Sequence, residues 1–471
     1  MTTDIIGQFM LASTHQRVQM ILDVKNHEAL LQYFGPKAFG QYERLAGRLD
    51  SGHLGLQAPK NLVVVPGLMG SLLKSETKGG IWWIDARTRR HIDDLRLSPD
   101  GLEDADPRNC VQPCTIDTSY EPFLTAILER EDFGHEIFAY DWRKSLTESA
   151  KPLRDLILEL YAKSGEEPVH LVGHSMGGLM IRVALMEYGE ELWPKVGKIV
   201  FIGTPHYGSP AISAYLKNHL SGFDLMALLG RYLSRETFRS MWGVLSLLPA
   251  PVGIYPGTVA GDAESHPCAN FQLYTASAWR LDLSDEEERN LQRVLDGAAL
   301  QHYQLKNWHQ GLDVRYRDKM LVIAGVGYRT LFRLAYSSAF PGIWATMKKT
   351  TSRLEGDINR EGDGRVSLAS VSLEGVAVRY VKGVHGELMN IPEVVEGTLR
   401  WLKGRETGLA ETVEGALRGH LGEGGGLDLT EPFSDDPGFW KNEIPQEARM
   451  KELEELLNQG VLWEFNYVKL L

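Results

Sequence analysis

Ser175 stands at the centre of the segment GHSMG, a G-x-S-x-G arrangement that follows the apolar run VHLV and precedes a helical pattern. A serine at a sharp strand-to-helix turn adopts strained backbone angles, and glycines beside it let the strand and the helix approach closely. Such a turn would present the hydroxyl as a nucleophile for acyl transfer. A glycine-rich turn after any buried strand would look similar, so a base and an acid must also be present.

Two further side chains are candidates for that acid and that base, in the chain order serine, acid, histidine. Asp363 lies between two glycines in NREGDGRVSLAS, and His385 follows the apolar run VAVRYV in KGVHGELMN. Glu361 and Asp357 are alternative acids in the same stretch. Taken alone, each residue has a plainer interpretation, a solvated loop carboxylate or a structural histidine. Placed after different strands at one edge of a sheet, the three would form a nucleophile, a base and an orienting acid.

Two backbone amides are candidates for stabilising an oxyanion beside the serine. The Met176 amide opens the helix that follows Ser175, and the Leu68 amide follows Pro66 and Gly67 in VVVPGLMGS. Amides at a helix start and in the loop after an earlier strand are suited to this role. A Pro-Gly pair marks a turn in any protein, so the Leu68 prediction depends on the three side chains above.

Short β-branched runs alternate with amphipathic segments along the middle of the chain and predict the elements that position these residues. Continuous apolar runs suit strands buried on both faces of a parallel sheet, so a doubly wound α/β fold is expected. One helix is expected at 153–161, after Pro152, and another directly after Ser175. The strands are predicted at 62–65, 137–140, 169–172, 199–202, 320–324 and 376–381.

Two stretches, 70–121 and 209–317, are too long for strand-to-helix connections and are interpreted as insertions. The second contains apolar helical segments and a helix beginning at Ser284 with Glu287 placed for a capping box, which predicts a helical cap or lid. The expected domains are an N-terminal helical extension at 1–58, a catalytic domain at 59–404, and a C-terminal extension at 405–471 with a Gly-rich linker and an amphipathic helix.

Composition limits the partners and the location. The 471 residues carry 50 basic and 62 acidic side chains, and a net charge of −12 argues against nucleic acid. No apolar run reaches the roughly 18 residues of a membrane span, so any contact with a lipid interface would be transient and from outside the bilayer. The first residues lack the basic region of a signal peptide. Three cysteines predict unpaired thiols in a reducing cytoplasm, with a Cys110–Cys114 bridge as the alternative.

Five stretches together resemble the lecithin:cholesterol acyltransferase-like branch of the α/β-hydrolases, which includes phospholipases and acyltransferases. In chain order they are VVVPGLMGSLL, AYDWRKS, LVGHSMGGLM, IGTPHYGSP, and GDGRVSLAS with VHGELMN behind it. The resemblance implies an α/β-hydrolase fold. It places the nucleophile, acid and base on Ser175, Asp363 and His385, and the oxyanion amides on Leu68 and Met176.

The resemblance also implies where an acyl group would bind. The segment IWWID is similar to a tryptophan-containing segment of the family, so Trp82 and Trp83 are expected to shelter the acyl pocket. Trp242 lies in an apolar part of the cap, which favours an acyl chain or an aromatic ester over a charged substrate. The family's well-known members are exported or membrane-tethered and often disulfide-bonded, whereas this sequence shows no export signal. The lipid specificity is therefore left open.

Three other polar residues near these motifs have structural interpretations. Asp141 and Arg143 in AYDWRKS are expected to form an ion pair that ties a loop to the sheet, with substrate orientation as the alternative. His206 is predicted to be a loop residue near the site, because the base comes last in this fold. Asp85, His91 and His206 lack the spacing of metal ligands, so neither a metal nor an organic cofactor is expected.

The sequence thus predicts a serine esterase or lipase that hydrolyses carboxylic esters, a small ester or a lipid, through an acyl-enzyme. A lipid acyltransferase or phospholipase would use the same residues, and only the acceptor or the bond cleaved would differ. A catalytically degenerate hydrolase that acts as an interaction module is the non-enzymatic alternative. The oligomeric state is left open.

Overall fold

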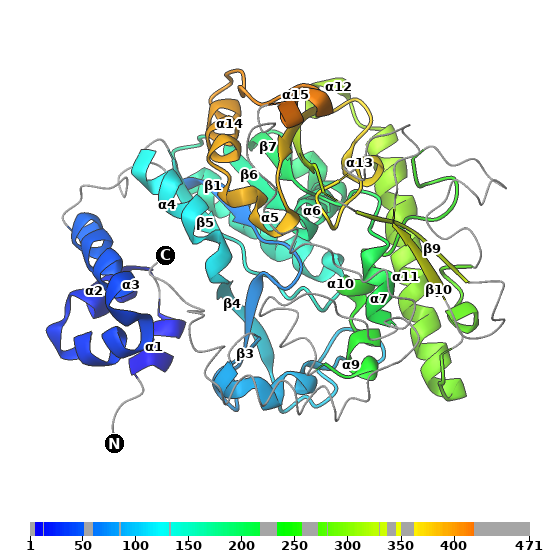
Figure 1. Ribbon diagram of the computed structural model, residues 1–471, viewed down its shortest axis with the longest axis horizontal. Helices are drawn as coiled ribbons and strands as arrows, with labels where there is room; N and C mark the ends of the chain where they lie inside the picture. Colours follow the sequence, from blue (N-terminus) through cyan, green and yellow to red (C-terminus); the bar gives the residue numbers. More distant parts are fainter. Residues whose placement is uncertain are drawn as a thin grey trace.

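A six-stranded parallel sheet lies at the centre of the computed structural model (Figure 1). Neighbouring strands follow the order β5-β1-β6-β7-β8-β11, and every neighbouring pair is parallel. The chain adds β5 on one side of β1 and all later strands on the other side, so the strand order reverses between β1 and β6. The strands are β1 (Lys60–Val65), β5 (Gly134–Ile137), β6 (Val169–His174), β7 (Val196–Ile202), β8 (Met320–Val326) and β11 (Ala377–Lys382).

The structure describes most of the chain between residues 5 and 418. The described ranges are 5–12, 14–50, 60–83, 86–130, 133–216, 233–256, 272–279, 281–328, 330–336, 345–349 and 362–418.

Helices cover both faces of the sheet, which confirms the expected doubly wound arrangement (Figure 1). On one face, α5 (Leu146–Lys163) packs beside α6 (Met176–Leu192), and α11 (Asp285–Gln310) contacts α6 from outside. On the other face, α4 (Glu121–Arg130) packs beside α14 (Pro392–Leu402). The central strands are therefore buried on both sides, as their unbroken apolar runs predicted.

Several element boundaries differ from the prediction, and two of the differences have a clear physical reason. The helix expected after Pro152 begins earlier, at Leu146, and contains Pro152, which is exposed. The strand expected at 137–140 is β5, which ends at Ile137. Phe138 and Tyr140 are buried beyond the end of the strand, where the Tyr140 amide donates to the Ser71 hydroxyl at 3.1 Å. The Phe138 amide still donates to the Val64 carbonyl of β1 at 3.0 Å, so the apolar character of these residues marks burial at the end of the sheet.

The first insertion, at 70–121, contains a small antiparallel sheet in the order β3-β2-β4. Its strands are β2 (Ser71–Ser75), β3 (Ile81–Trp83) and β4 (Val111–Ile116). A second antiparallel pair, β9 (Leu331–Tyr336) and β10 (Ala345–Lys349), precedes the Asp363 loop. The sequence patterns anticipated neither feature, because the strands are short and interrupted by polar residues.

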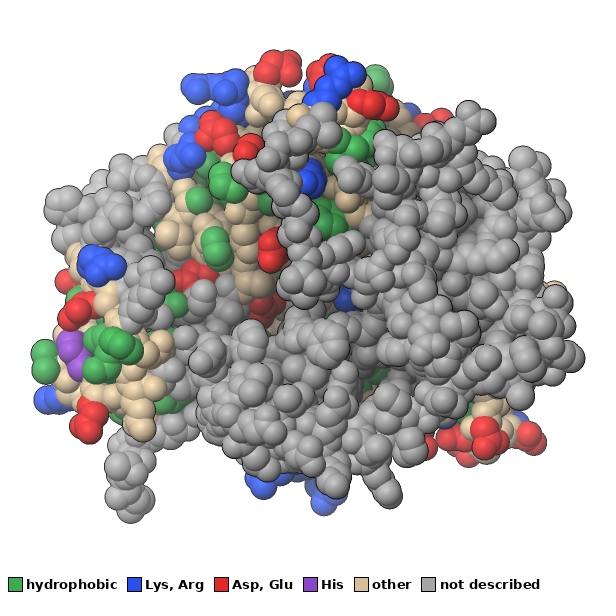
Figure 2. Space-filling view, in the orientation of Figure 1, with side chains coloured by type: hydrophobic (Ala, Val, Ile, Leu, Met, Phe, Trp, Pro, Cys, Tyr) green, Lys and Arg blue, Asp and Glu red, His purple; other side chains and the backbone are tan. Residues whose placement is uncertain are grey.

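The second insertion is helical where the structure describes it. It contains α7 (Ala211–Leu216), α9 (Arg235–Arg239), α10 (Trp242–Leu245) and the long helix α11. The capping box expected at Ser284 and Glu287 is confirmed. Acidic side chains gather at the N-terminal end of α11 (Figure 2), where the first turn carries four carboxylates that interact favourably with the helix dipole. The apolar segment DLMALLGRYL, at 224–233, lies outside the described residues except for Leu233, which is buried.

Both ends of the described chain add helices. The first residues form α1 (Ile5–Leu11), α2 (Thr14–Leu22) and α3 (His27–Asp50). After α14, the chain returns to the sheet, where the Tyr380 amide in β11 donates to the Ala410 carbonyl at 2.8 Å, and continues to α15 (Val413–Arg418). The boundary predicted at 404 therefore falls within packed structure. The predicted linker beyond 418 and the amphipathic helix lie outside the described residues.

Two features of the sequence bear on the membrane and on the thiols. No helix in the described ranges is long and apolar enough to cross a membrane. Cys110 and Cys114 are both free thiols, so the alternative of a bridge between them is wrong. Burial raises the pKa of the Cys114 thiol to about 11, which keeps it protonated near neutral pH.

Candidate active site

Ser175 lies at the turn between β6 and α6, at the carboxyl end of the sheet and at the point where the strand order reverses. Its backbone has φ 51° and ψ −125°, a conformation that an L-residue rarely adopts. The Ser175 amide donates to the Ile202 carbonyl of β7 at 2.8 Å, which anchors the strained residue. The turn has the geometry of the nucleophile elbow that the G-x-S-x-G pattern predicted.

Close contacts explain the glycines around this turn. A Cβ at Gly173 would lie 2.7 Å from the Cα of Gly178 in the helix. A Cβ at Gly177 would lie 2.2 Å from the Val65 carbonyl oxygen, and one at Gly178 would lie 2.0 Å from the Thr204 Oγ1. Larger side chains would therefore push α6 away from the neighbouring strands and move the serine.

The structure brings Ser175, His385 and Asp363 into one chain of hydrogen bonds. His385 Nε2 lies 2.9 Å from Ser175 Oγ, and His385 Nδ1 lies 2.7 Å from Asp363 Oδ2. A carboxylate can only accept, so Nδ1 carries the proton and donates to Asp363. The Nε2 lone pair then accepts from the Ser175 hydroxyl. The three side chains come from loops that follow different strands, as expected.

The loop around Asp363 is held by several backbone contacts. Asp363 is 2% exposed, and its Oδ1 accepts from the amides of Arg365 at 2.9 Å and Val366 at 2.7 Å. The His385 amide donates to the Asp363 carbonyl at 2.9 Å, which joins the acid and base loops directly. The alternative acids Glu361 and Asp357 lie outside the described residues.

The loop after β1 lies directly against the serine. A Cβ at Gly67 would lie 2.8 Å from the Ser175 Cβ, so only glycine permits this approach. We call residues 66–69 the oxyanion loop. The amides of Leu68 and Met176 make no hydrogen bond within the described part of the chain. Met176 follows Ser175 directly, and Leu68 follows Gly67, which approaches the Ser175 Cβ. Two unpaired N–H groups beside a nucleophile could donate to a negatively charged oxygen.

The neighbouring tryptophans have structural partners. Trp82 and Trp83 have no exposed surface. The Trp83 indole donates to the carbonyl of Met69 in the oxyanion loop at 2.9 Å, and Trp82 stacks on His91 with ring centroids 4.6 Å apart. Both rings are fully buried in this arrangement, and their role in sheltering an acyl group stays a prediction. Trp83 supports the loop that carries the Leu68 amide.

Trp242 packs between the first insertion and α11. A Cβ at Gly101 would lie 2.3 Å from its ring, and a Cβ at Gly297 would lie 2.5 Å from it. The side chain is only half-buried, so contact between Trp242 and a substrate remains a prediction.

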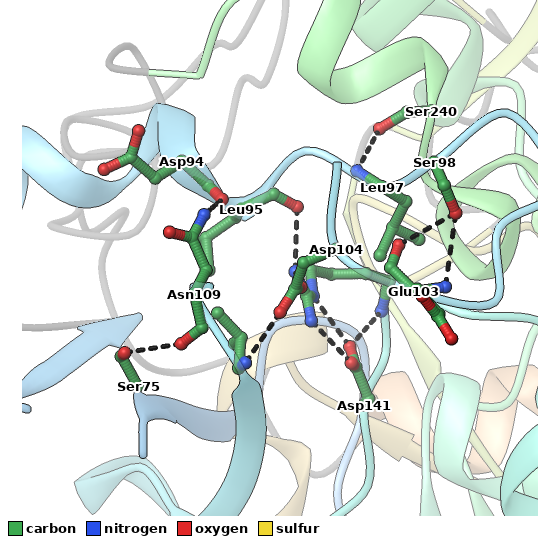
Figure 3. Close-up of polar contacts among 12 residues, drawn as sticks. Ser75, Asp94, Leu95, Leu97, Ser98, Glu103, Asp104, Asn109, Asp141 and Ser240 are labelled. Atoms are coloured by element: carbon green, nitrogen blue, oxygen red, sulfur yellow. Dashed lines mark hydrogen bonds and ion pairs between the residues drawn. The ribbon is translucent and has the colours of Figure 1, made fainter. Parts of the chain in front are cut away.

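Arg143 has the structural role that was expected. Its guanidinium is fully buried and pairs with Asp141 at 2.7 Å and Asp104 at 2.8 Å, and it also donates to the Leu95 carbonyl at 2.9 Å. Figure 3 shows Asp104 and Asp141 converging on these interactions. Burial by itself lowers the pKa of Arg143, but the two carboxylates outweigh it and the pKa is raised. This cluster ties the loop after β5 to the first insertion.

The residues considered as metal ligands do not come together. His91 hydrogen-bonds Asp94 at 2.8 Å, whereas His206 is buried beside Arg182, with its Nδ1 3.3 Å from the guanidinium. Asp85 lies outside the described residues. Among the described residues, no group of three or more His, Cys, Asp or Glu side chains is arranged to hold a metal ion. Burial and the adjacent Arg182 charge lower the pKa of His206, which keeps it neutral.

Two residues behind the site were not identified from the sequence. His174 precedes the nucleophile, and Tyr120 ends the first insertion. Their side chains form a buried hydrogen bond of 2.8 Å between the Tyr120 hydroxyl and His174 Nδ1. His174 was visible in the GHSMG segment, but nothing in the spacing connected it to Tyr120.

Comparison with known proteins finds similarity over part of the chain. Residues 134–269, from β5 through the elbow into the second insertion, match the family model of lecithin:cholesterol acyltransferase. The uncharacterized protein YJR098C of Saccharomyces cerevisiae is 26% identical over 154 residues, which are 31% of this chain and only 23% of the yeast protein.

Several solved structures align with most of the chain at low TM-scores. The Tle4–Tli4 complex has a TM-score of 0.45 at 16% identity and covers 72% of this chain and 96% of that chain. The mature Bacillus licheniformis lipase BlEst2 has a TM-score of 0.33 at 15% identity, over 71% and 87% of the two chains. The Bacillus subtilis carboxylesterase CesB has a TM-score of 0.29 at 15% identity, over 74% and 85%.

The strand order, the reversal between β1 and β6 and the elbow are those of an α/β-hydrolase. Residues 134–269 are similar to the lecithin:cholesterol acyltransferase family, and this segment includes the elbow.

Proposed function

We propose that the protein is a serine hydrolase that cleaves carboxylic esters through an acyl-enzyme. The observation that carries this proposal is the chain of hydrogen bonds from Ser175 Oγ through the His385 ring to the Asp363 carboxylate, with distances of 2.9 and 2.7 Å. The strained backbone of Ser175 supports it, because strain of this kind is costly and is concentrated at functional sites.

In the first half-reaction, Ser175 Oγ attacks the ester carbonyl carbon while His385 Nε2 takes the hydroxyl proton. The carbonyl oxygen becomes an oxyanion, to which the amides of Leu68 and Met176 donate. Collapse of the intermediate breaks the bond to the alcohol, and His385 returns the proton to the departing oxygen. Asp363 holds the imidazole in the required tautomer and stabilises the imidazolium that forms in between.

In the second half-reaction, an acceptor attacks the acyl-enzyme by the same route in reverse. Water gives a carboxylic acid, and His385 transfers the proton from the water to Ser175 Oγ. The substrates we propose are esters with an apolar acyl group, lipids among them. The family match and the apolar helices of the second insertion support this class.

The test is loss of activity in Ser175→Ala, measured with a p-nitrophenyl acyl ester. We expect turnover to fall by about 10⁵-fold or more, as triad deletions do in other hydrolases. Labelling by a fluorophosphonate probe should disappear in the same variant. Ser164→Ala is a suitable control, because Ser164 lies at the C-terminal end of α5, where its hydroxyl donates to the Tyr161 carbonyl. Retained turnover and labelling in Ser175→Ala would exclude the proposal.

Acyl transfer to an alcohol is the second candidate, and the match to the lecithin:cholesterol acyltransferase family model favours it. The residues would have the same roles, and only the acceptor would change. Product analysis with a labelled acyl lipid and competing sterol or alcohol acceptors separates the two. A transferred acyl group that exceeds the free acid would assign the protein as a transferase.

A further inference from the structure

A second chain of hydrogen bonds runs behind Ser175 and connects the two loops on either side of it. The Gly67 amide lies 2.8 Å from the Tyr120 hydroxyl, which lies 2.8 Å from His174 Nδ1. On the other side of the ring, His174 Nε2 lies 3.0 Å from the His385 carbonyl oxygen. The route therefore runs from the oxyanion loop to the backbone of His385. None of it passes through the Ser175 hydroxyl.

Each hydrogen bond in this chain has only one possible direction. The His385 carbonyl can only accept, so His174 Nε2 carries a proton and donates to it. Burial lowers the pKa of His174 to about 3, so the ring is neutral and Nδ1 is an acceptor. The Tyr120 hydroxyl therefore donates to Nδ1, and its oxygen accepts from the Gly67 amide.

Both ends of this chain hold a group with a role in the proposed reaction. At one end, the Gly67 amide is fixed by Tyr120, one residue before Leu68, whose amide is the proposed oxyanion donor. At the other end, the His385 carbonyl is fixed by His174 while the His385 amide is fixed by the Asp363 carbonyl at 2.9 Å. The backbone of the base is thus held from both sides.

Burial and ring packing restrain this chain of hydrogen bonds. The Tyr120 side chain is 4% exposed and His174 is 6% exposed, so water does not readily replace either partner. The two rings also pack edge to face, with centroids 5.6 Å apart. A second contact joins the Tyr120 segment to the turn that begins at His385, because the Asn390 side-chain amide donates to the Ser119 carbonyl at 2.7 Å.

We propose that Tyr120 and His174 are positioning residues that hold the oxyanion loop and the His385 backbone in fixed relation across Ser175. This inference rests on the proposed hydrolase function, because it assigns the two residues a role in the same reaction. Their hydrogen bonds end on backbone groups and not on the Ser175 hydroxyl or the His385 ring nitrogens, and the His174 ring also packs against the His385 ring with centroids 5.2 Å apart. The two residues act by keeping the oxyanion donor and the base aligned at once, so their loss should affect the transition state more than substrate binding.

The experiment compares Tyr120→Phe with Tyr140→Phe. Tyr140 is also fully buried, and its hydroxyl donates to the Pro66 carbonyl of the same loop at 3.1 Å, but it has no contact with His174. Each substitution removes one buried tyrosine hydroxyl beside the oxyanion loop. Only Tyr120→Phe interrupts the connection to His385.

The readouts are kcat and KM for a p-nitrophenyl acyl ester, the rate of fluorophosphonate labelling, and the thermal midpoint. For Tyr120→Phe we expect kcat and the labelling rate to fall about 10- to 100-fold while KM changes by less than about threefold. For Tyr140→Phe we expect kcat within about threefold of the wild-type value at a similar loss of thermal midpoint. An equal fall of kcat in both variants, or no fall in Tyr120→Phe, would overturn the inference.

Substitutions of His174 provide a second test that does not depend on the folding of Tyr120→Phe. His174→Gln can still donate to the His385 carbonyl, whereas His174→Phe cannot. We expect kcat to be higher in His174→Gln than in His174→Phe by about tenfold. Equal kcat values in the two variants would argue against the inference. If the wild-type protein itself fails to label, the proposed function fails, and that result is distinct from either outcome here.

Discussion

Asp363 uses its two carboxylate oxygens for different purposes. Oδ1 accepts from the backbone amides of Arg365 and Val366, and Oδ2 accepts from His385 Nδ1. The first set of bonds fixes the orientation of the carboxylate, and the second fixes the tautomer of the base. An uncharged amide of the same shape could satisfy the first set but not the second, which separates the structural and chemical roles of this residue.

Asp363→Asn should therefore leave the fold intact and remove most of the activity. The asparagine oxygen would stay on the two amides, and its NH2 group would face His385 Nδ1. The imidazole would then carry its proton on Nε2, where it could no longer accept from Ser175. We expect kcat to fall by about 10⁴-fold, as this change does in a serine protease.

The measurement is kcat at neutral pH together with the thermal midpoint. A midpoint close to that of the wild-type protein, combined with the expected fall in kcat, would identify the tautomer as the cause. A fall of less than tenfold would mean that another group orients His385.

At the scale of single residues, the sequence predicted the site best at positions where the backbone geometry allows only certain residue types. The glycines around Ser175 are needed for close packing, so their pattern identified the elbow. The choice of Asp363 over Glu361 depended on the resemblance and not on spacing alone. Tyr120 was missed because its partner, His174, is distant in sequence and a tyrosine at the end of an insertion has no distinguishing pattern.

At the scale of elements, the Arg143 cluster joins three parts of the chain. It connects the loop after β5 with the first insertion through Asp104 and the Leu95 carbonyl. The Arg143 carbonyl also accepts from the Gly243 amide at the start of α10, at 2.9 Å. The helical insertion and the small antiparallel sheet are therefore attached to the central sheet at one buried point. This explains how such long insertions can keep a fixed position.

Arg143→Met should destabilise the protein strongly. The substitution keeps an apolar stem of similar length but leaves the carboxylates of Asp104 and Asp141 buried without their partner. We expect the free energy of unfolding to fall by about 3–5 kcal/mol, the usual cost of breaking a buried pair on one side. The measurement is equilibrium unfolding in urea.

The matched control for this experiment is Arg108→Ala. Arg108 pairs with Asp106 at 2.8 Å, but its side chain is 85% exposed. Solvent screens that pair, so the free energy of unfolding should stay close to the wild-type value. Similar losses of unfolding free energy in both variants would contradict the prediction that the buried Arg143 pairs stabilise the fold more than an exposed pair does.

The elements of the central sheet were predictable because burial on both faces produces unbroken apolar runs. The same signal misplaced the strand at β5, where Phe138 and Tyr140 are apolar but lie beyond the end of the strand. The helix predicted to begin after Pro152 starts earlier, because an exposed proline can lie inside a helix, as Pro152 does in α5. Both errors arise because the residue types of a short segment indicate how buried it is. They do not show which backbone hydrogen bonds it makes.

At the scale of the whole molecule, burial keeps many histidines uncharged. Their pKa values fall below the usual value of 6.5, mainly because the interior disfavours the charged form. The pKa of His174 falls to about 3. A pKa of about 4 is found for four others, His135, His170, His302 and His309. The pKa of His206 is also lowered, mainly by burial, with the Arg182 charge adding to the effect. These residues come from strands, helices and loops on both sides of the site.

Stability should therefore depend steeply on pH in the acid range. The unfolded chain takes up protons on these histidines below about pH 6.5, whereas the native chain does so only near pH 4 or below. The free energy of unfolding should fall as the pH decreases from about 6.5 to 4, and should change little through these groups above 6.5. Urea midpoints measured at intervals between pH 4.5 and 7.5 would show this trend.

His302→Gln tests whether the buried histidines cause the slope. The His302 ring is 2% exposed, and its Nε2 donates to the Leu248 carbonyl at 2.9 Å, a bond that a glutamine amide can also make. Removing one titrating group should reduce the slope of the free energy of unfolding by about 1.4 kcal/mol per pH unit, the equivalent of one proton. An unchanged slope in this variant would show that other groups, such as the surface carboxylates, govern the acid sensitivity of the fold.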